Sequence, residues 1–367
     1  MTKTTKIVYG SLLVVIAILL AVGGVFDLTI ANNVYQPENL VARILECVGY
    51  LPPFLFVGGM FAVLFFRVKA EDEKRKIKQV VFAGCTALTY VVFGYMMAGE
   101  ILSVLWQKVL VGVGSTILLT PLSLLFFRGR RDEELKRYEI FLIFASIVCV
   151  ISSLLTINVV KFLWGRARYR EMMADGDLLF EAFTPWYHPN GFTLHGHHSF
   201  PSGHTSAATN LMTLFALEEV FLIDKGRKKA IYIVVGMWIF IMAYSRLVLG
   251  AHFLSDVTGG FAVGFVTYVV ARYVYFDKSR AVVTAIMEVN AMTDEEDARA
   301  ANAETTGETI KDPEIVESDR AEIAQTEILA PETEIPAPER EEQEAEGKVG
   351  SAAETQTETE EAPKGEV

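Results

Sequence analysis

The sequence predicts an all-α fold, a polytopic helical bundle that crosses a membrane about eight times. Three observations indicate this fold class. Hydrophobic residues make up 51% of the chain. Apolar runs of about 20 residues, the length that a helix needs to cross a hydrocarbon core of about 30 Å, recur through the first 280 residues. Most basic residues of this region stand in the connections between the runs.

Each apolar run is expected to form one membrane-spanning helix, because soluble proteins do not carry this many long runs. The runs cover residues 7–26, 44–66, 80–99, 109–127, 139–160, 203–223, 230–249 and 257–276. Cys47, Cys85 and Cys149 fall inside runs and are expected to be small apolar packing residues rather than disulfides, ligands or nucleophiles. The first run follows Lys3 and Lys6, as in a signal anchor or a cleaved signal peptide, and we expect it to be retained.

The C-terminal segment, residues 281–367, has a different composition. It holds 25 acidic and 6 basic residues and no aromatic residue. Such a segment cannot bury enough apolar surface to offset the entropy of ordering, so we predict a disordered acidic tail, either solvated or docked on a partner. The whole chain has a formal charge of -12 and the tail alone supplies -19, which leaves +7 for the first 280 residues. The acidic total therefore does not argue against an anionic substrate.

The orientation follows from the basic residues of the connections. Residues 67–79, 128–138 and 224–229 hold 6, 5 and 4 Lys and Arg, whereas the opposite connections together hold 7. The positive-inside rule then places the first set and both termini in the cytoplasm. We expect a multi-pass protein of the plasma membrane, with the second set of connections on the outer face.

Three separated groups of polar residues fall on this expected outer face. They are Lys161 with Arg168; the run Pro201, Ser202, Gly203 and His204; and Ser245, Arg246, His252 and Asp256. Each group alone has an ordinary structural explanation, such as a capped helix start or side chains that snorkel to the interface. Together they supply three cations, two imidazoles, a hydroxyl and a carboxylate, which suits the binding of a phosphate and its transfer through histidine.

The chemistry of two groups can be argued from their spacing. Ser202 is a good N-cap and opens a helix whose free N–H groups suit an anion, while Gly203 lets the backbone approach a ligand. His252 and Asp256 stand four residues apart, so on a helix they would share a face. A carboxylate bonded to one imidazole nitrogen would leave the other free to attack.

In order, spacing and membrane face, the three groups resemble the type 2 phosphatidic acid phosphatase family, which includes lipid pyrophosphate phosphatases and vanadium-dependent haloperoxidases. The resemblance covers about residues 139–276. It implies N-terminal transmembrane helices in 1–138, phosphatase core helices with an extracytoplasmic active site in 139–280, and the tail in 281–367. The family core usually has six membrane helices with the first polar group after the third; here that group follows the fifth run, so the resemblance implies two helices added in front of a six-helix core. Tyr169 departs from the family, which usually has proline there.

The resemblance also implies roles. His252 resembles the nucleophile that becomes phosphohistidine, Asp256 its orienting partner, and His204 the general acid. The positions that resemble ligands of phosphate oxygens are Lys161, Arg168, Ser202, Gly203 and Arg246. With two such histidines, kcat/KM is expected to be bell-shaped against pH.

The function that the resemblance implies is an integral membrane phosphatase. It would hydrolyse lipid-linked phosphate or diphosphate monoesters at the outer leaflet, with undecaprenyl diphosphate, phosphatidylglycerol phosphate and phosphatidate as candidate substrates. A lipid phosphotransferase with an alcohol acceptor and a non-enzymatic scaffold or transporter stay open, whereas a haloperoxidase fits less well because those relatives are soluble. No nucleic-acid partner is expected, and protein partners are not readable from the sequence.

No metal or other cofactor is expected. His195, His197 and His198 form a dense imidazole cluster, but no cysteine lies on the same face and adjacent histidines do not all ligate readily. The surrounding stretch 169–200 is rich in aromatic residues, which we interpret either as interfacial anchors or as a lid over the site.

Overall fold

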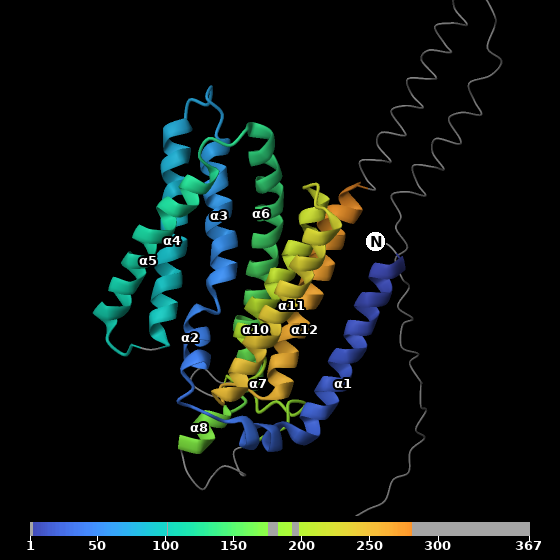
Figure 1. Ribbon diagram of the computed structural model, residues 1–367. Coiled ribbons are helices and arrows are strands. Elements are labelled where there is room, and N and C mark those ends of the chain that lie inside the picture. The colour runs from blue at the N-terminus through green and yellow to red at the C-terminus, as the bar shows by residue number, and fades with distance from the viewer. Residues whose placement is uncertain (1–2, 101, 175–182, 193–197, 281–367) are drawn as a thin grey trace, which may run out of the picture. The chain divides into compact units, whose positions relative to one another are not determined.

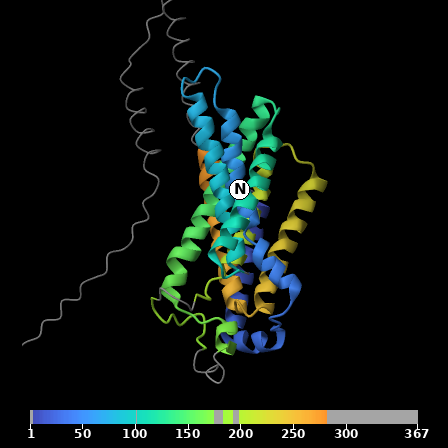
Figure 2. The same cartoon turned by 90° about the vertical axis from the view of Figure 1, so that its left-hand side faces the viewer.

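The computed structural model describes residues 3–100, 102–174, 183–192 and 198–280. Within these residues the fold is a bundle of helices, and no strand occurs among them (Figure 1). Figure 2, turned by 90°, shows that the long helices keep a common direction. The predicted all-α, polytopic membrane class is confirmed. The predicted tail, residues 281–367, lies outside the described residues.

Six helices in the described part of the chain are long and apolar enough to cross a membrane. They are α1 (Lys3–Val34), the pair α2 (Leu40–Val48) and α3 (Leu51–Arg67), α4 (Arg75–Gly99), α5 (Leu105–Phe127), α11 (Lys225–Val248), and α12 (Leu254–Arg272) with its continuation η3 (Tyr273–Lys278).

The other two predicted spans are also helical, but less regular. In the first, α6 (Asp132–Ser153) passes through the π-helix η1 (Leu154–Val160) into the short α7 (Lys161–Trp164). In the second, α10 (Gly203–Thr209) continues as the 3₁₀-helix η2 (Asn210–Glu219). Neither belongs to the six helices above, because α6 carries charged side chains as far as Glu139 and α10 with η2 is only 17 residues long.

The predicted span 44–66 is broken in the middle. α2 ends at Val48, and α3 starts at Leu51 with Pro52 and Pro53 in its first turn, where the missing N–H groups cost no helical hydrogen bond. The break separates a short amphipathic helix from the long apolar one. As a result Glu46 and Tyr50, on either side of the break, reach into the interior of the bundle at one end.

α6 lies at the centre of the apolar packing. One cluster joins it to α12 and includes Phe144, Val148 and Phe265. Another joins it to α3 and includes Val63 and Phe141. α3, which precedes the core expected from the sequence, therefore packs on the same central helix as α12, and α4 and α5 pack on α3 (Figure 1).

Small residues bring the helices that carry the polar groups into close contact. A Cβ at Gly260 of α12 would overlap the carbonyl oxygen of Ser202, and one at Gly264 would lie 2.7 Å from Thr209 Cβ. A Cβ at Gly23 of α1 would lie 2.8 Å from Ser255 Cβ. Close approach through small residues is a common way for membrane helices to pack, and here it fixes α10 and α1 against the start of α12.

The polar groups and the basic connections lie at opposite ends of the bundle. α2, α7 and α8 (Tyr169–Ala174) gather at one end, while the connections after α3 and after α5 lie at the other (Figure 1). The charge bias found in the sequence is therefore a difference between the two ends of the molecule.

Candidate functional site

The two histidines predicted to react lie close together at the end of the bundle that holds α7 and α8. His252 lies in the connection between α11 and α12 and is 3% exposed, and His204 lies in the first turn of α10 and is 6% exposed. Burial lowers the pKa of His252 well below its ordinary value. The charged or titratable groups near enough to lower that pKa further are Lys161, Arg168, Arg246 and His204. The three groups of the sequence therefore converge.

The ring of His252 is fixed by a backbone carbonyl. Its Nδ1 lies 2.6 Å from the carbonyl oxygen of Ser199. A carbonyl oxygen can only accept, so Nδ1 carries the proton and donates it. In the neutral imidazole, the lone pair is then on Nε2, the nitrogen that is free to react.

Asp256 does not hold His252 in the way the spacing predicted, and this expectation needs correction. Its Oδ2 lies 3.9 Å from His252 Nδ1, which is too far for a hydrogen bond. The physical reason is that α12 begins at Leu254, so His252 precedes the helix and the four-residue spacing does not put both side chains on one face. Instead, Asp256 accepts hydrogen bonds from Ser199 Oγ at 2.5 Å and from the backbone N–H of Phe253 at 2.7 Å. It therefore positions the residues on both sides of the His252 ring.

His204 is fixed through its other nitrogen. Its Nε2 lies 2.8 Å from the carbonyl oxygen of Glu46, so Nε2 donates and Nδ1 is left to exchange a proton. The ring also packs against Tyr50, with 4.3 Å between the ring centroids. Glu46 and Tyr50 come from α2 and from the break before α3, a region for which the sequence had indicated no role.

At the start of α10, the backbone at Gly203 has no side chain and lies close to the Lys161 ammonium group. Ser202 is the N-cap of α10, and its Oγ accepts from the backbone N–H of Thr205. A Cβ at Gly203 would lie 2.6 Å from Tyr50 Oη and 3.6 Å from Lys161 Nζ. Glycine is therefore required by space here, and the helix N-terminus faces the Lys161 ammonium group, an arrangement suited to an anion.

Lys161 and Arg168, the two cations of the first predicted group, lie near His252. Burial, followed by repulsion from Arg168, lowers the pKa of Lys161 to about 8. Arg168 has a buried Nε that makes no hydrogen bond within the described residues, and its nearest carboxylate, that of Glu171, lies 3.8 Å away. Arg168 thus keeps a donor for a ligand.

Arg246 is present in the cluster but is already engaged. It is fully buried, its Nη1 lies 3.1 Å from Glu46 Oε1, and its Nη2 donates to the carbonyl oxygen of Ala42 at 3.1 Å. The sequence predicted that Arg246 holds phosphate oxygens directly. In the structure its guanidinium group is hydrogen-bonded to Glu46 and Ala42 of α2. Any contact with phosphate therefore uses the guanidinium N–H groups that do not bind these two residues.

A buried ion network lies next to the segment that carries His252. Arg166, 1% exposed, lies 2.9 Å from the carboxylate of Asp27 and 2.6 Å from that of Asp256. It also donates to Ser255 Oγ at 2.8 Å and covers the ring of Phe253 at 4.3 Å. The network joins α1, the connection after α7 and the start of α12.

A family model described as PAP2 superfamily matches residues 142–280. The chain carries a PAP2 superfamily domain. This domain supports the resemblance to the type 2 phosphatidic acid phosphatases seen in the sequence, and all eight predicted site residues fall inside it.

One curated protein similar to this chain is named phosphatidylglycerophosphatase B, from Bacillus subtilis (strain 168). The two are 32% identical over 93 residues, which is 24% of this chain and 42% of the relative. The chain therefore spans less than half the length of this relative. No solved structure matched the chain.

Three residues that contact the site lie outside the PAP2 match and were missed from the sequence: Asp27, Glu46 and Tyr50. A signal for two of them was available. Asp27 directly follows the first apolar run and Glu46 stands inside the second, and an ionisable residue in a membrane segment indicates a function or a buried partner. Tyr50 carries no such signal. Arg166 and Ser199 lie inside the match but also escaped notice, since neither occurs in the three groups.

The connection after α7 is fastened to its neighbours by aromatic side chains. Tyr169, which stands where the family usually has proline, is buried and its Oη donates to Asn32 Oδ1 at 2.6 Å. Trp186 stacks on Phe200, and its Nε1 donates to the carbonyl oxygen of Leu20 at 2.8 Å. For these residues the structure agrees with packing rather than with a free lid.

The histidine cluster considered as a metal site is only partly described. His195 and His197 lie outside the described residues, while the ring of His198 packs against Phe162 with 5.1 Å between the centroids. Among the residues that the structure describes, no three His, Cys, Asp or Glu side chains form a group that could hold a metal ion.

Proposed function

We propose that this protein is an integral membrane phosphatase that hydrolyses lipid-linked phosphate or diphosphate monoesters at the outer leaflet. Its nucleophile is His252, which becomes phosphohistidine. One observation carries the proposal: the Ser199 carbonyl fixes the proton of His252 on Nδ1, so the lone pair of Nε2 is available in a cluster that also holds Lys161 and Arg168.

The reaction proceeds in two transfers. Nε2 of His252 attacks phosphorus, a P–N bond forms, and the P–O bond to the leaving group breaks. His204 enters this step as the imidazolium, with a proton on each ring nitrogen, and its Nδ1 gives a proton to the departing oxygen. His204 then takes a proton from water, whose oxygen attacks phosphorus while the P–N bond breaks. The products are the dephosphorylated lipid, inorganic phosphate and a regenerated pair of histidines.

Neighbouring cations and backbone N–H groups stabilise the negative charge on the phosphoryl oxygens during the transfer. Lys161 and Arg168 supply positive charge, and the N–H groups at the start of α10 supply donors next to Gly203. Since phosphoryl transfer needs little covalent work from the protein, positioning and charge carry most of the acceleration. The lowered pKa of His252 keeps the nucleophile neutral through the physiological range.

A lipid substrate is supported by three observations, and the outer leaflet is supported by a fourth. The site stands at the end of a bundle of apolar helices, the PAP2 domain belongs to a family of membrane lipid phosphatases, and a relative is named for a lipid phosphate. The connections rich in Lys and Arg lie at the other end of the bundle, so the positive-inside rule turns the site outward.

The test replaces one histidine at a time in the purified full chain. His252→Ala is expected to abolish phosphate release from a panel of lipid phosphates and diphosphates in detergent. His188→Ala is the matched control, because His188 is an exposed histidine of the same outer connections. Release by His252→Ala at the rate of the control would contradict the proposal.

A further inference from the structure

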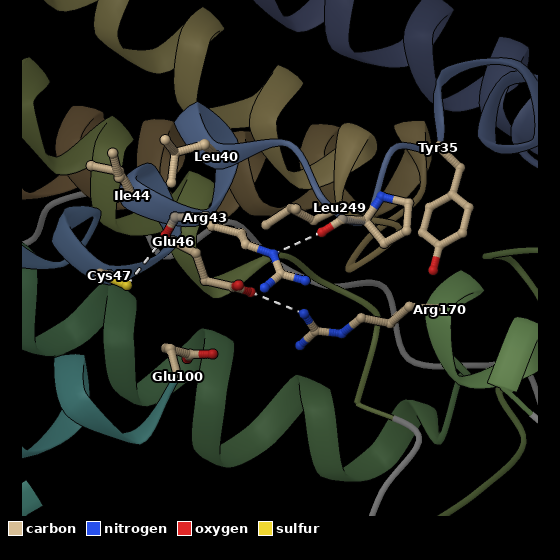
Figure 3. A pocket seen from close by; sticks show the side chains of 10 residues that line it. Tyr35, Leu40, Arg43, Ile44, Glu46, Cys47, Glu100, Arg170 and Leu249 are labelled. Carbon is tan, nitrogen blue, oxygen red and sulfur yellow. Dashed lines mark hydrogen bonds and ion pairs between the residues drawn. The ribbon is translucent and has the colours of Figure 1, made fainter. Parts of the chain in front are cut away.

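A cavity of about 500 Å³ lies directly beside the site, on the side of α2 (Figure 3). Its charged lining consists of Arg43 and Glu46 from α2, Glu100 from the end of α4, and Arg170 from α8. Tyr35 and Leu249 also line the cavity. Most of this lining comes from residues before the PAP2 match, so the cavity is a feature of this chain rather than of the family segment.

Glu46 connects the cavity to the reacting groups. Its Oε1 lies 3.1 Å from Arg170 Nη1 and equally 3.1 Å from Arg246 Nη1, so the two guanidinium groups share one oxygen. The backbone carbonyl of the same residue holds His204. Under the proposed function His204 protonates the leaving group, so Glu46 lies between the cavity and the residue that acts on the leaving group.

The two arginines of the cavity are placed to bind an anion. Figure 3 shows the guanidinium groups of Arg43 and Arg170 pointing into the same space, with the Glu46 carboxylate beside them. Arg43 pairs with Glu38, whose side chain is 84% exposed, and exposed pairs of this kind contribute little free energy. Arg43 can therefore exchange Glu38 for a ligand. Guanidinium groups match the oxygens of phosphate groups by paired hydrogen bonds.

We propose that this cavity binds a second anionic phosphorus group, carried by the leaving group of the substrate, through Arg43 and Arg170. The inference rests on the proposed function and deepens it. The preferred substrates are lipid phosphates with two anionic phosphorus groups, one cleaved at His252 and one held in the cavity. In a diphosphate, the second phosphorus group is joined to the cleaved one by a bridging oxygen. In a phosphodiester headgroup, a short spacer separates the two groups. Both kinds of substrate present anionic phosphate oxygens to the arginines.

The experiment compares three substrates with the purified full chain in detergent micelles. Phosphatidate has one phosphorus group, whereas phosphatidylglycerol phosphate and an isoprenoid diphosphate each have two. For Arg43→Gln and for Arg170→Gln, the ratio of kcat/KM for a substrate with two groups to kcat/KM for phosphatidate is expected to fall at least tenfold. Arg43→Lys keeps the positive charge and is expected to restore most of the ratio. Arg227→Gln, at an exposed arginine of α11, is the matched control.

The outcomes separate the possible sources of the second group. A fall for the diphosphate alone, for the phosphodiester alone or for both supports the cavity and identifies its ligand. An unchanged ratio, or an equal loss for all three substrates, overturns the inference. Because Arg43 is half exposed, its variant is expected to fold even if Arg170→Gln does not. If the unchanged protein released no phosphate from any of the three lipids, the proposed function itself would fail.

Discussion

At the scale of single residues, the two histidines are oriented by backbone carbonyls and use opposite nitrogens. Ser199 holds Nδ1 of His252, and Glu46 holds Nε2 of His204. The spacing of the sequence proposed both histidines as the reacting groups. It could not name their partners, because Ser199 is 53 residues and Glu46 is 158 residues away along the chain. Only the fold brings these carbonyls to the rings.

Lys161 gives a prediction for the dependence of anion binding on pH. Its pKa is lowered to about 8, so its positive charge is present below that pH and is lost as the pH rises through it. The inhibition constant of inorganic phosphate is therefore expected to rise as the pH passes about 8, by up to about tenfold per unit. It is measured by inhibition of phosphate release.

Lys161→Arg is the control for this titration. Arginine stays charged throughout this range, so the inhibition constant of that variant is expected to stay flat above pH 8, whatever its absolute value. An equal rise in both proteins would show that another group titrates, and the assignment to Lys161 would be wrong.

At the scale of helices, the positions of the apolar runs could be predicted, but their interruptions could not. Each of the eight runs contains helix in the structure. The break between α2 and α3 was hidden, since Gly49, Tyr50 and the two prolines stand inside a long apolar run and hydropathy alone does not register them. The error on Asp256 has the same origin. The spacing rule assumed that His252 and Asp256 lie on one helix, whereas α12 starts after His252, at Leu254.

The contact between α10 and α12 gives a prediction at this scale. Gly260→Ala would push a methyl group into the carbonyl of Ser202, a backbone atom that cannot move without shifting the start of α10. Overpacking of this kind costs about 1–3 kcal/mol. We expect a lower thermal midpoint in detergent and a marked loss of phosphate release. Gly236→Ala on α11, where a Cβ meets nothing within 4 Å, is expected to leave both unchanged. Equal behaviour of the two variants would contradict the packing described here.

At the scale of the whole molecule, the segment before the PAP2 match is part of the site. α1 supplies Asp27, and the region of α2 and α3 supplies Glu46 and Tyr50. The sequence left these helices without a role, because its three groups all lie after residue 160. Contacts between distant helices depend on how they pack, and packing cannot be read from the hydropathy of each helix alone.

The ion network around Arg166 gives the prediction for this scale. Asp27→Ala removes one of the two carboxylates that neutralise Arg166 in a buried place, and breaking such a pair costs about 3–5 kcal/mol. We expect a clear drop in the thermal midpoint of the purified protein. Glu38→Ala, at a carboxylate that is 84% exposed, is the comparison and is expected to change little. A midpoint for Asp27→Ala equal to that of Glu38→Ala would show that α1 is not locked to the site through this pair.

The central claim is that His252 carries the phosphoryl group on the nitrogen opposite the one held by Ser199. The most direct measurement is a rapid quench of the reaction with a phosphorus-labelled lipid phosphate, under alkaline conditions that preserve phosphohistidine, followed by peptide mapping and separation of the two phosphohistidine isomers. The account predicts the label on His252 at Nε2. A label on Nδ1, or on any other residue, or no covalent label while the lipid is turned over, would contradict it.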